Sequence, residues 1–163
     1  MDHDEEAAWR AIGMTMTKLR WALECQLERD ADLSFMEYYT LARLSEESNR
    51  TLRMSELAVI TNQSLSRLSH LVKRLEERGL VRRATDAADG RFTNAILTDT
   101  GYAKLVASAP AHVETVRALI IDAFSAAELQ QLREALERML ARIDAQQNIE
   151  RTVSRAKPST PSA

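Results

Sequence analysis

The chain of 163 residues holds a single cysteine, three prolines, four glycines and few aromatic residues. With Cys25 alone, no disulfide can form within the chain, which is typical of proteins in a reducing compartment. No apolar run approaches the roughly 18 residues that a membrane-spanning helix needs. The acidic first residues do not resemble a signal peptide. We therefore expect a soluble cytoplasmic protein with no membrane partner.

Motifs for catalysis and for metal binding are also missing. The chain has no glycine-rich phosphate loop and no Gly-x-Ser-x-Gly sequence, and its carboxylates form no convincing catalytic pair. The three histidines, His3, His70 and His112, lack metal-ligand spacing, and one cysteine cannot complete a thiolate site. We expect neither an enzyme nor a protein with a cofactor or a metal ion.

The overall charge gives no sign of a nucleic-acid partner, but its distribution does. The chain has 22 Lys and Arg against 24 Asp and Glu, which gives a net charge of −2. Between Ser64 and Arg91, seven basic residues stand against four acidic ones, a local charge of +3. The first ten residues instead hold four acidic residues and one arginine. Positive charge gathered in one segment is the pattern expected of a DNA-binding surface.

This basic segment starts with an amphipathic helix that Ser64 is predicted to cap. At about 100° per residue, one side of the helix is apolar and is expected to face a core: Leu65, Leu68, Leu71, Val72 and Leu75. The opposite side carries hydroxyl and basic groups: Ser66, Arg67, His70, Lys73 and Arg74. Small hydroxyls let a helix approach a surface closely, and long cations reach phosphates. We therefore predict that the polar side, with Ser64, contacts DNA.

A basic hairpin follows this helix, and a shorter helix precedes it. The hairpin comprises a helix stop at Gly79, an extended run over Leu80–Ala84, a turn at Asp89–Arg91 and a returning run over Phe92–Thr98. Arg82 and Arg83 alternate across the first run, so only one of them faces phosphate, and Arg83 is our candidate. The shorter helix spans Glu56–Thr61, with Ser55 as its predicted cap and Asn62 in a left-handed turn. This is a helix-turn-helix with a wing.

Longer helices flank this part on both sides. One is predicted over Glu5–Arg29, and Ser-x-x-Glu capping boxes at Ser34 and Ser125 start two others. Another begins at Thr98 and is expected to bend at Pro110. A helix of about 25 residues spans about 37 Å, more than a winged-helix core needs to cover. The remaining apolar stripes therefore predict a homodimer.

These patterns predict a mainly α (α+β) fold with about six helices and a two- to three-stranded wing. The predicted organisation is an N-terminal dimerisation helix (residues 1–33), a winged helix-turn-helix lobe (34–98), C-terminal dimerisation helices (99–148) and a disordered tail (149–163). Two recognition helices in such a dimer would face half-sites about one DNA turn apart, ~34 Å.

The order of these elements resembles the MarR family of bacterial transcription regulators, over roughly Ala8 to Asp144. The specific motifs are the helix exit Leu75-Glu76-Glu77-Arg78-Gly79-Leu80-Val81, the wing sequence Asp89-Gly90-Arg91 and the helix start Leu97-Thr98-Asp99-Thr100-Gly101. Two departures are His70, where the family often has Arg, and Asn62-Gln63 in place of the more usual Gly-Leu turn.

The resemblance implies roles for individual residues. The first set faces the major groove or its phosphates: Ser64, Ser66, Arg67, His70 and Arg74. Arg91 would enter the minor groove, held in place by Asp89. The resemblance also implies repression of neighbouring genes, relieved when a small, often aromatic or phenolic, molecule or an oxidant acts on the dimer.

Several alternatives stay open at this stage. Trp21, Phe35, Tyr38 and Tyr39, with Met36, either line an effector pocket or belong to the core. Cys25 is either an oxidant sensor or a structural residue, and its neighbours Glu24 and Glu28 favour the structural role. The same fold could also serve as a constitutive architectural DNA-binding protein without an effector, or bind protein in place of DNA.

Overall fold

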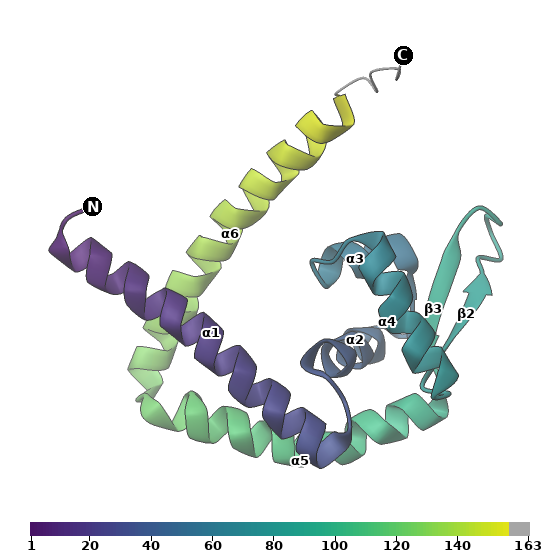
Figure 1. Ribbon diagram of the computed structural model, residues 1–163, viewed down its shortest axis with the longest axis horizontal. Coiled ribbons are helices and arrows are strands. Elements are labelled where there is room, and N and C mark those ends of the chain that lie inside the picture. Colours follow the sequence, from purple (N-terminus) through teal and green to yellow (C-terminus); the bar gives the residue numbers. More distant parts are fainter. Residues whose placement is uncertain (157–163) are drawn as a thin grey trace. The chain divides into compact units, whose positions relative to one another are not determined.

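A computed structural model describes residues 1–156, with side chains up to residue 148. The elements of this described part follow in order (Figure 1): α1 (His3–Ala31), α2 (Phe35–Glu46), β1 (Thr51–Arg53), α3 (Met54–Ile60), α4 (Leu65–Glu77), β2 (Val81–Thr85), β3 (Thr93–Leu97), α5 (Asp99–Leu119), the 3-10 turn η1 (Ile121–Ala123) and α6 (Ala126–Ala156). The predicted mainly helical fold, with six helices and a small sheet, is confirmed. None of the described helices is long and apolar enough to cross a membrane.

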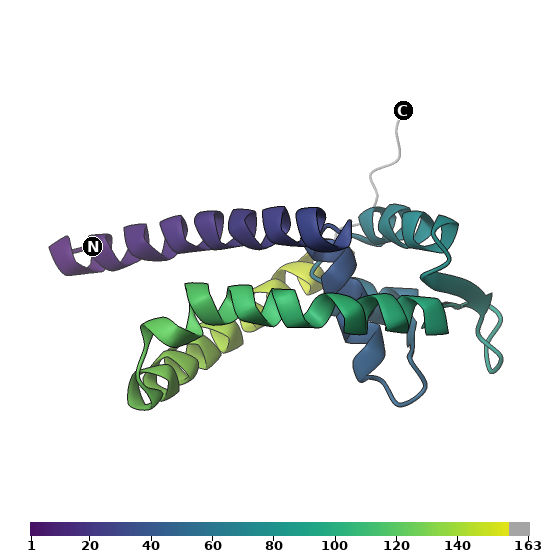
Figure 2. The same ribbon diagram turned by 90° about the horizontal axis from the view of Figure 1, so that it is seen from below.

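The chain divides into two compact units, residues 1–119 and the part from Ile120 onward. In the first unit, α1 begins earlier than predicted because Asp2 and Glu5 form a capping box. The Asp2 carboxylate accepts from the Glu5 amide at 2.8 Å, and the Glu5 carboxylate accepts from the Asp2 amide at 2.8 Å. α1 packs against α5 (Figure 2). Leu23 and Leu27 are buried near its end, whereas Trp9 stays 60% exposed near its start.

The predicted Ser34 capping box at the start of α2 is confirmed. Ser34 Oγ accepts from the Glu37 amide at 3.2 Å, and Glu37 Oε2 accepts from the Ser34 amide at 3.0 Å. The prediction that Ser55 caps the next helix is wrong. β1 runs directly into α3, so Arg53 is the residue before the helix, and its amide donates to Glu56 Oε2 at 3.3 Å. Ser55 lies inside the first turn of α3.

The recognition helix α4 begins and ends as the sequence predicts. Ser64 Oγ accepts from the Arg67 amide at 3.3 Å, and Asn62 before it has a left-handed φ of 50°. At the other end Gly79 has a φ of +71°, and the Leu80 amide donates to the Leu75 carbonyl at 2.9 Å. With the Gly79 amide bonded to the carbonyl of Glu76, this is a Schellman C-cap.

One predicted core residue of α4 is not buried. Leu68 and Leu75 are fully covered, but Leu65 is 54% exposed. Leu65 is the first residue of the helix and lies at the edge of its apolar face, beyond the elements that cover Leu68. The prediction that it faces the core is therefore wrong.

The small sheet has the order β1-β3-β2, with both pairings antiparallel. Thr51 lies opposite Ile96, and Val81 lies opposite Leu97. Val81, Ala95 and Leu97 are buried, so one face of the sheet completes the core. The wing is thus two strands, and β1 makes the third of the sheet.

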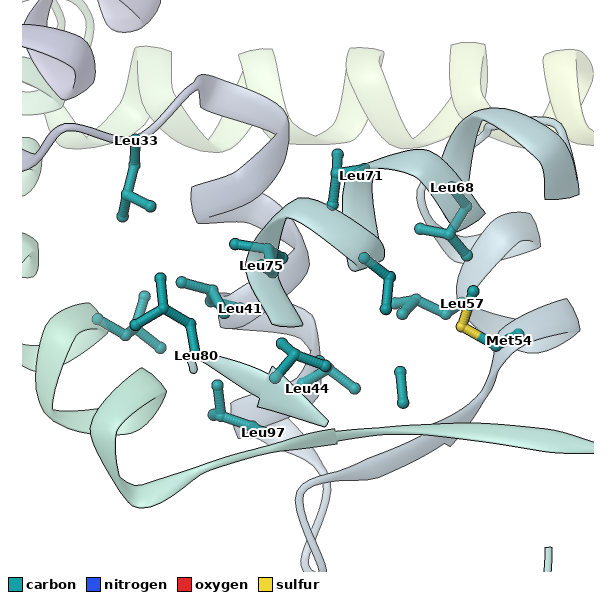
Figure 3. Close-up of a cluster of buried hydrophobic side chains, with 14 of the residues drawn as sticks. Leu33, Leu41, Leu44, Met54, Leu57, Leu68, Leu71, Leu75, Leu80 and Leu97 are labelled. Carbon is teal, nitrogen blue, oxygen red and sulfur yellow. The ribbon is translucent and has the colours of Figure 1, made fainter. Parts of the chain in front are cut away.

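The core is a leucine-rich cluster to which α2, α3, α4, β2 and β3 contribute buried side chains, with Leu52 of β1 packed against it (Figure 3). Its fully covered members include Leu41 and Leu44 from α2, Leu57 from α3, and Leu68 and Leu75 from α4. Fully burying a leucine contributes about 1.5–3 kcal/mol. The amphipathic α4 is held by this cluster, and its polar side is left facing outward.

α5 starts at a tight junction with the end of α4. Thr98 Oγ1 donates to the carbonyl of Gly79 at 2.7 Å and accepts from the Gly101 amide at 2.9 Å. A Cβ atom added at Gly101 would lie 2.0 Å from the Leu80 carbonyl oxygen, so the backbones meet too closely for any side chain. This contact explains the glycine of the Leu-Thr-x-x-Gly motif. Further along, α5 continues through Pro110 without ending.

The second unit consists of η1 and α6. The predicted Ser125 capping box is confirmed: the Ser125 amide donates to Glu128 Oε2 at 2.8 Å, and the Glu128 amide donates to Ser125 Oγ at 3.4 Å. α6 extends to Ala156, past residue 149 where the disordered tail was expected to begin. No Gly or Pro interrupts the chain between Ser125 and Ala156, so nothing local stops the helix. The rest of the expected tail, residues 157–163, lies outside the described residues.

Replacing Gly101 by alanine should destabilise the first unit by more than about 1–3 kcal/mol, the usual cost of overpacking, because backbone and not a flexible side chain opposes the new methyl group. Urea unfolding followed by circular dichroism measures the change in the free energy of unfolding. Gly90→Ala is the matched control, since its Cβ would meet only Thr85 Cγ2 at 3.8 Å. Equal stability of the two variants would contradict the junction described here.

Candidate nucleic-acid interface

The polar side of α4 is exposed over its whole length. The exposed set includes all five of its predicted residues: Ser66, Arg67, His70, Lys73 and Arg74. On the opposite side of α4, four residues are buried: Leu68, Leu71, Val72 and Leu75. The helix therefore cannot rotate without losing its core contacts. The side chains are thereby displayed as one surface, which we call the α4 face. Lys73 also lies 3.8 Å from Glu77 Oε1 on the same surface.

One flank of α4 is tied to α2. Arg74 Nε donates to Glu37 Oε1 at 3.3 Å, and Arg78 Nη1 lies 3.6 Å from Glu37 Oε2. Arg78 also donates to the backbone carbonyl of Asp32 at 2.6 Å and to its carboxylate at 3.0 Å. These contacts link α4 to the turn between α1 and α2. Sequence analysis identified Glu37 as a capping residue only, because nothing local signals a partner 37 residues away.

The other flank of α4 is tied to the wing. Arg83 on β2 donates from Nε and Nη2 to Glu76 Oε2 at 2.9 and 2.7 Å, and its amide donates to Glu76 Oε1 at 2.9 Å. These hydrogen bonds from Arg83 hold the pKa of the Glu76 carboxyl below its usual value. Arg83, predicted to contact phosphate, thus joins β2 to α4. Arg82, on the alternate side of the strand, is exposed.

The turn of the wing presents Arg91 on a rigid support. Arg91 donates to Asp89 from Nε at 2.9 Å and from Nη2 at 2.6 Å, and its own amide donates to Asp89 Oδ1 at 3.1 Å. The side chain of Arg91 is still 85% exposed. The hydrogen bonds from Arg91 lower the pKa of Asp89, and Asp89 raises the pKa of Arg91. A planar fork held in this way keeps one orientation for a ligand.

Asp86, which sequence analysis missed, organises the turn from inside. Its Oδ1 accepts from the amides of Ala88 and Asp89 at 2.9 and 3.1 Å, and its Oδ2 accepts from Arg53 Nε at 3.2 Å and from the Asn94 amide group at 3.3 Å. The bonds from the two backbone amides are the main cause of its lowered pKa. An Asp that lies two and three residues before the amides it accepts from is typical of an Asx turn. The sequence therefore did contain a signal for the role of Asp86.

An aromatic ring stabilises the same turn. The guanidinium of Arg53 lies over Phe92, 4.5 Å from the ring centroid, and that of Arg91 lies 6.0 Å from it. Arg53 therefore connects β1 to the wing through both Asp86 and Phe92.

Of the four aromatic residues proposed for an effector pocket, three lie at the start of α2 and Trp21 lies on α1. Phe35 and Tyr39 stack with their ring centroids 6.2 Å apart. Tyr38 instead packs against His112, and the centroids of these two rings are 4.4 Å apart. Trp21 is 70% exposed on α1, in a shallow surface depression with Met16, Thr17, Arg20 and Glu24. Glu24 accepts from the Phe35 amide at 3.0 Å, and this hydrogen bond connects α1 to the start of α2.

His112 is half-buried on α5. Its Nδ1 lies 2.9 Å from Oε1 of Gln26, a residue that is 2% exposed. Burial lowers the pKa of His112 and raises that of Tyr38 beside it. Cys25 is partly exposed. Among the side chains described, up to residue 148, no three of His, Cys, Asp or Glu gather to hold a metal ion.

A helix-turn-helix followed by an antiparallel hairpin with a supported arginine defines a winged helix-turn-helix protein. The model of the MarR family matches residues 31–91. Sco3205 of Streptomyces coelicolor, a MarR family transcriptional regulator solved in complex with DNA, is 40% identical over 86% of this chain and 88% of its own, with a TM-score of 0.82. AbsC, a MarR family transcriptional regulator of the same organism, is 35% identical over 89% of this chain and 97% of its own, with a TM-score of 0.85.

The S. aureus MepR–DNA complex shares the fold, with a TM-score of 0.73 at 24% identity over 81% of this chain and 95% of its own. No curated protein sequence matches the chain. Because the chain is 40% identical to Sco3205 and 35% identical to AbsC, it belongs to the MarR family of transcriptional regulators. Proteins of this family are regulators and not enzymes.

Because the pKa of Asp86 is lowered in the folded wing, its contribution to stability is present above the ordinary carboxyl pKa of about 3.9. That contribution is lost only as the pH falls through the lower, folded value. The amide NMR signals of Ala88 and Asp89 should therefore stay in place near pH 4 and move at more acidic pH. In Asp86→Ala these two amides should exchange faster with solvent already at pH 7. If the midpoint of this movement of the two amide signals lay above pH 3.9, it would contradict the hydrogen bonds described here.

Proposed function

We propose that this protein binds double-stranded DNA as a homodimer and regulates transcription at a pseudo-palindromic operator. The observation that carries the proposal is the exposed α4 face lying in the same rigid lobe as Arg91, in a chain 40% identical to a regulator solved with DNA. In this proposal the α4 face contacts the major groove and its phosphates. Arg91 enters the minor groove from the wing, oriented by Asp89.

The chemistry of these groups supports the assignment. An arginine can bond guanine with two parallel hydrogen bonds, and each such pair contributes about 1–3 kcal/mol of discrimination. The start of α4 at Ser64 adds free backbone amides that suit a phosphate. Contacts with phosphates release counterions, so binding should weaken steeply as salt rises.

The homodimer is supported by apolar side chains that a single chain leaves exposed. They lie along three helices: Trp9, Met14, Met16 and Trp21 on α1, Val106, Val113 and Leu119 on α5, and Leu136, Leu140 and Ile143 on α6. On α6 the three side chains share one face of the helix, and exposed apolar residues that gather in this way are more than the ordinary scatter on a surface. A second copy of the chain would cover them and present two recognition helices.

Repression and release by a small molecule complete the proposal, and both rest on family membership. Aromatic compounds are the first class to test, because Phe35, Tyr38 and Tyr39 lie at the start of α2, and Trp21 lies about one turn before Glu24 of α1, which bonds the Phe35 amide. The alternative is a constitutive regulator with the same fold and no effector. A broad screen of small aromatics for release of bound DNA distinguishes the two, since only an effector-controlled protein would release DNA.

Selection of bound fragments from genomic DNA would provide the operator and test DNA binding itself. On that operator, Arg91→Ala should weaken binding more than tenfold at 150 mM salt, because the supported guanidinium is lost from the wing. Fluorescence anisotropy measures the affinity, and thermal unfolding confirms that the variant stays folded. Arg10→Ala, which removes an exposed arginine near the start of α1, should bind as the wild type does. Unchanged binding by Arg91→Ala would remove the wing from the proposal.

Sedimentation equilibrium should find a species of twice the chain mass. Leu140→Glu should weaken this association at least tenfold, because it brings a charge into the apolar stripe of α6, where Leu140 is 56% exposed in the single chain. Gln131→Glu adds the same charge on the opposite side of α6 and should leave the mass unchanged. A wild-type protein that sediments as a monomer would rule out the dimer.

A further inference from the structure

Glu37 is a buried carboxylate that faces the recognition helix. It is 7% exposed, and its two oxygens serve different partners. Oε1 accepts from Arg74 Nε at 3.3 Å, while Oε2 accepts from the Ser34 amide at 3.0 Å and lies 3.6 Å from Arg78 Nη1. A buried carboxylate needs such partners, because an unpaired one would be strongly destabilising. Glu37 therefore caps the start of α2 and at the same time binds Arg74 of α4 and Arg78 directly after it.

The way in which Glu37 holds Arg74 leaves most of that guanidinium available. Only Nε is engaged, so both terminal NH₂ groups, with four N–H donors between them, have no hydrogen bond within the described residues. The Arg74 side chain is 56% exposed on the α4 face. Arg83 differs, because Glu76 takes both its Nε and its Nη2 and the side chain is 35% exposed.

A partly engaged arginine has an advantage in binding phosphate. A free side chain such as that of Arg67 must lose its conformational freedom when it binds, and this loss opposes binding. Arg74 is already restrained by Glu37, and its planar fork can bond the carboxylate on one edge and a phosphate on another.

We propose that Glu37 is a positioning residue for DNA binding, which holds Arg74 so that its terminal NH₂ groups bond a phosphate of the duplex. The contact forms a carboxylate–guanidinium–phosphate chain from α2 through α4 to DNA. This inference rests on the proposed DNA-binding function, and it adds a residue that would not itself touch DNA.

Two opposite effects make the proposal testable at Glu37. If Glu37 is merely a negative charge near the duplex, replacing it by neutral glutamine should strengthen binding. If it positions Arg74, the same change should weaken binding, because glutamine offers one acceptor oxygen where two are used. The sign of the change distinguishes the two roles.

The experiment measures the affinity of the full-length protein for its selected operator duplex between 50 and 300 mM salt. Arg74→Ala should weaken binding and lower the slope of log K against log salt by about one. Glu37→Gln should weaken binding about fivefold, the fold-change that corresponds to ordering one long side chain on binding. In the Arg74→Ala background, Glu37→Gln should no longer weaken binding. The matched control is Glu46→Gln at the end of α2, which pairs with Arg43 outside the α4 face and should bind as the wild type does.

Arg74→Lys provides a second test that leaves Glu37 intact. Lysine keeps the charge but cannot bond a carboxylate and a phosphate along two edges, so binding should fall toward that of Arg74→Ala. Arg74→Ala should stay folded, since Glu37 keeps Arg78 and the Ser34 amide, and thermal unfolding checks this.

Tighter binding by Glu37→Gln, or wild-type binding by Arg74→Lys, would overturn the proposal. If Glu37→Gln does not fold, the result for Arg74→Lys decides alone. A wild-type protein that ignores duplex DNA would instead refute the proposed function, and with it this inference. Binding by the wild type with no loss in Arg74→Ala would refute the positioning role alone.

Discussion

The proposed DNA-binding surface depends on the burial of one side of α4. Leu68, Leu71, Val72 and Leu75 are held in a close-packed leucine cluster, so the helix has one rotational setting. In that setting the basic residues of α4 face solvent, and they need no further interaction to stay exposed. Electrostatic function at the surface is thus fixed by apolar packing beneath it, because rotating the helix would expose several leucines at about 1.5–3 kcal/mol each.

Ion pairs add a second level of order on this frame. Glu37 on one flank and Glu76 on the other each bind an arginine from another element, and Asp86 performs the same task inside the wing. Such pairs contribute little to stability where solvent reaches them. Their effect is on geometry: they reduce the number of orientations that the arginines can take.

How well the sequence predicted each feature depended on how local its cause was. The caps at Ser34 and Ser64 and the stop at Gly79 arise within a few residues, and all three were predicted. The prediction that Ser55 caps α3 was wrong, because β1 extends to Arg53, the residue directly before that helix. β1 is held by its pairing with β3, which lies far along the chain. The partnership of Glu37 with Arg74 was missed for the same reason. Periodicity identifies the exposed face, but it does not identify what touches that face from another element.

The two ends of the hairpin are fastened to each other at its base. The Thr98 amide donates to the Leu80 carbonyl at 3.2 Å, and the Thr98 hydroxyl bonds the carbonyl of Gly79. The loop between them therefore begins and ends at one fixed point of the lobe. Its tip can grow, shrink or change in sequence at small entropic cost to the folded lobe, since lengthening a closed loop is cheap. The tip and the core of the lobe can therefore vary independently of each other.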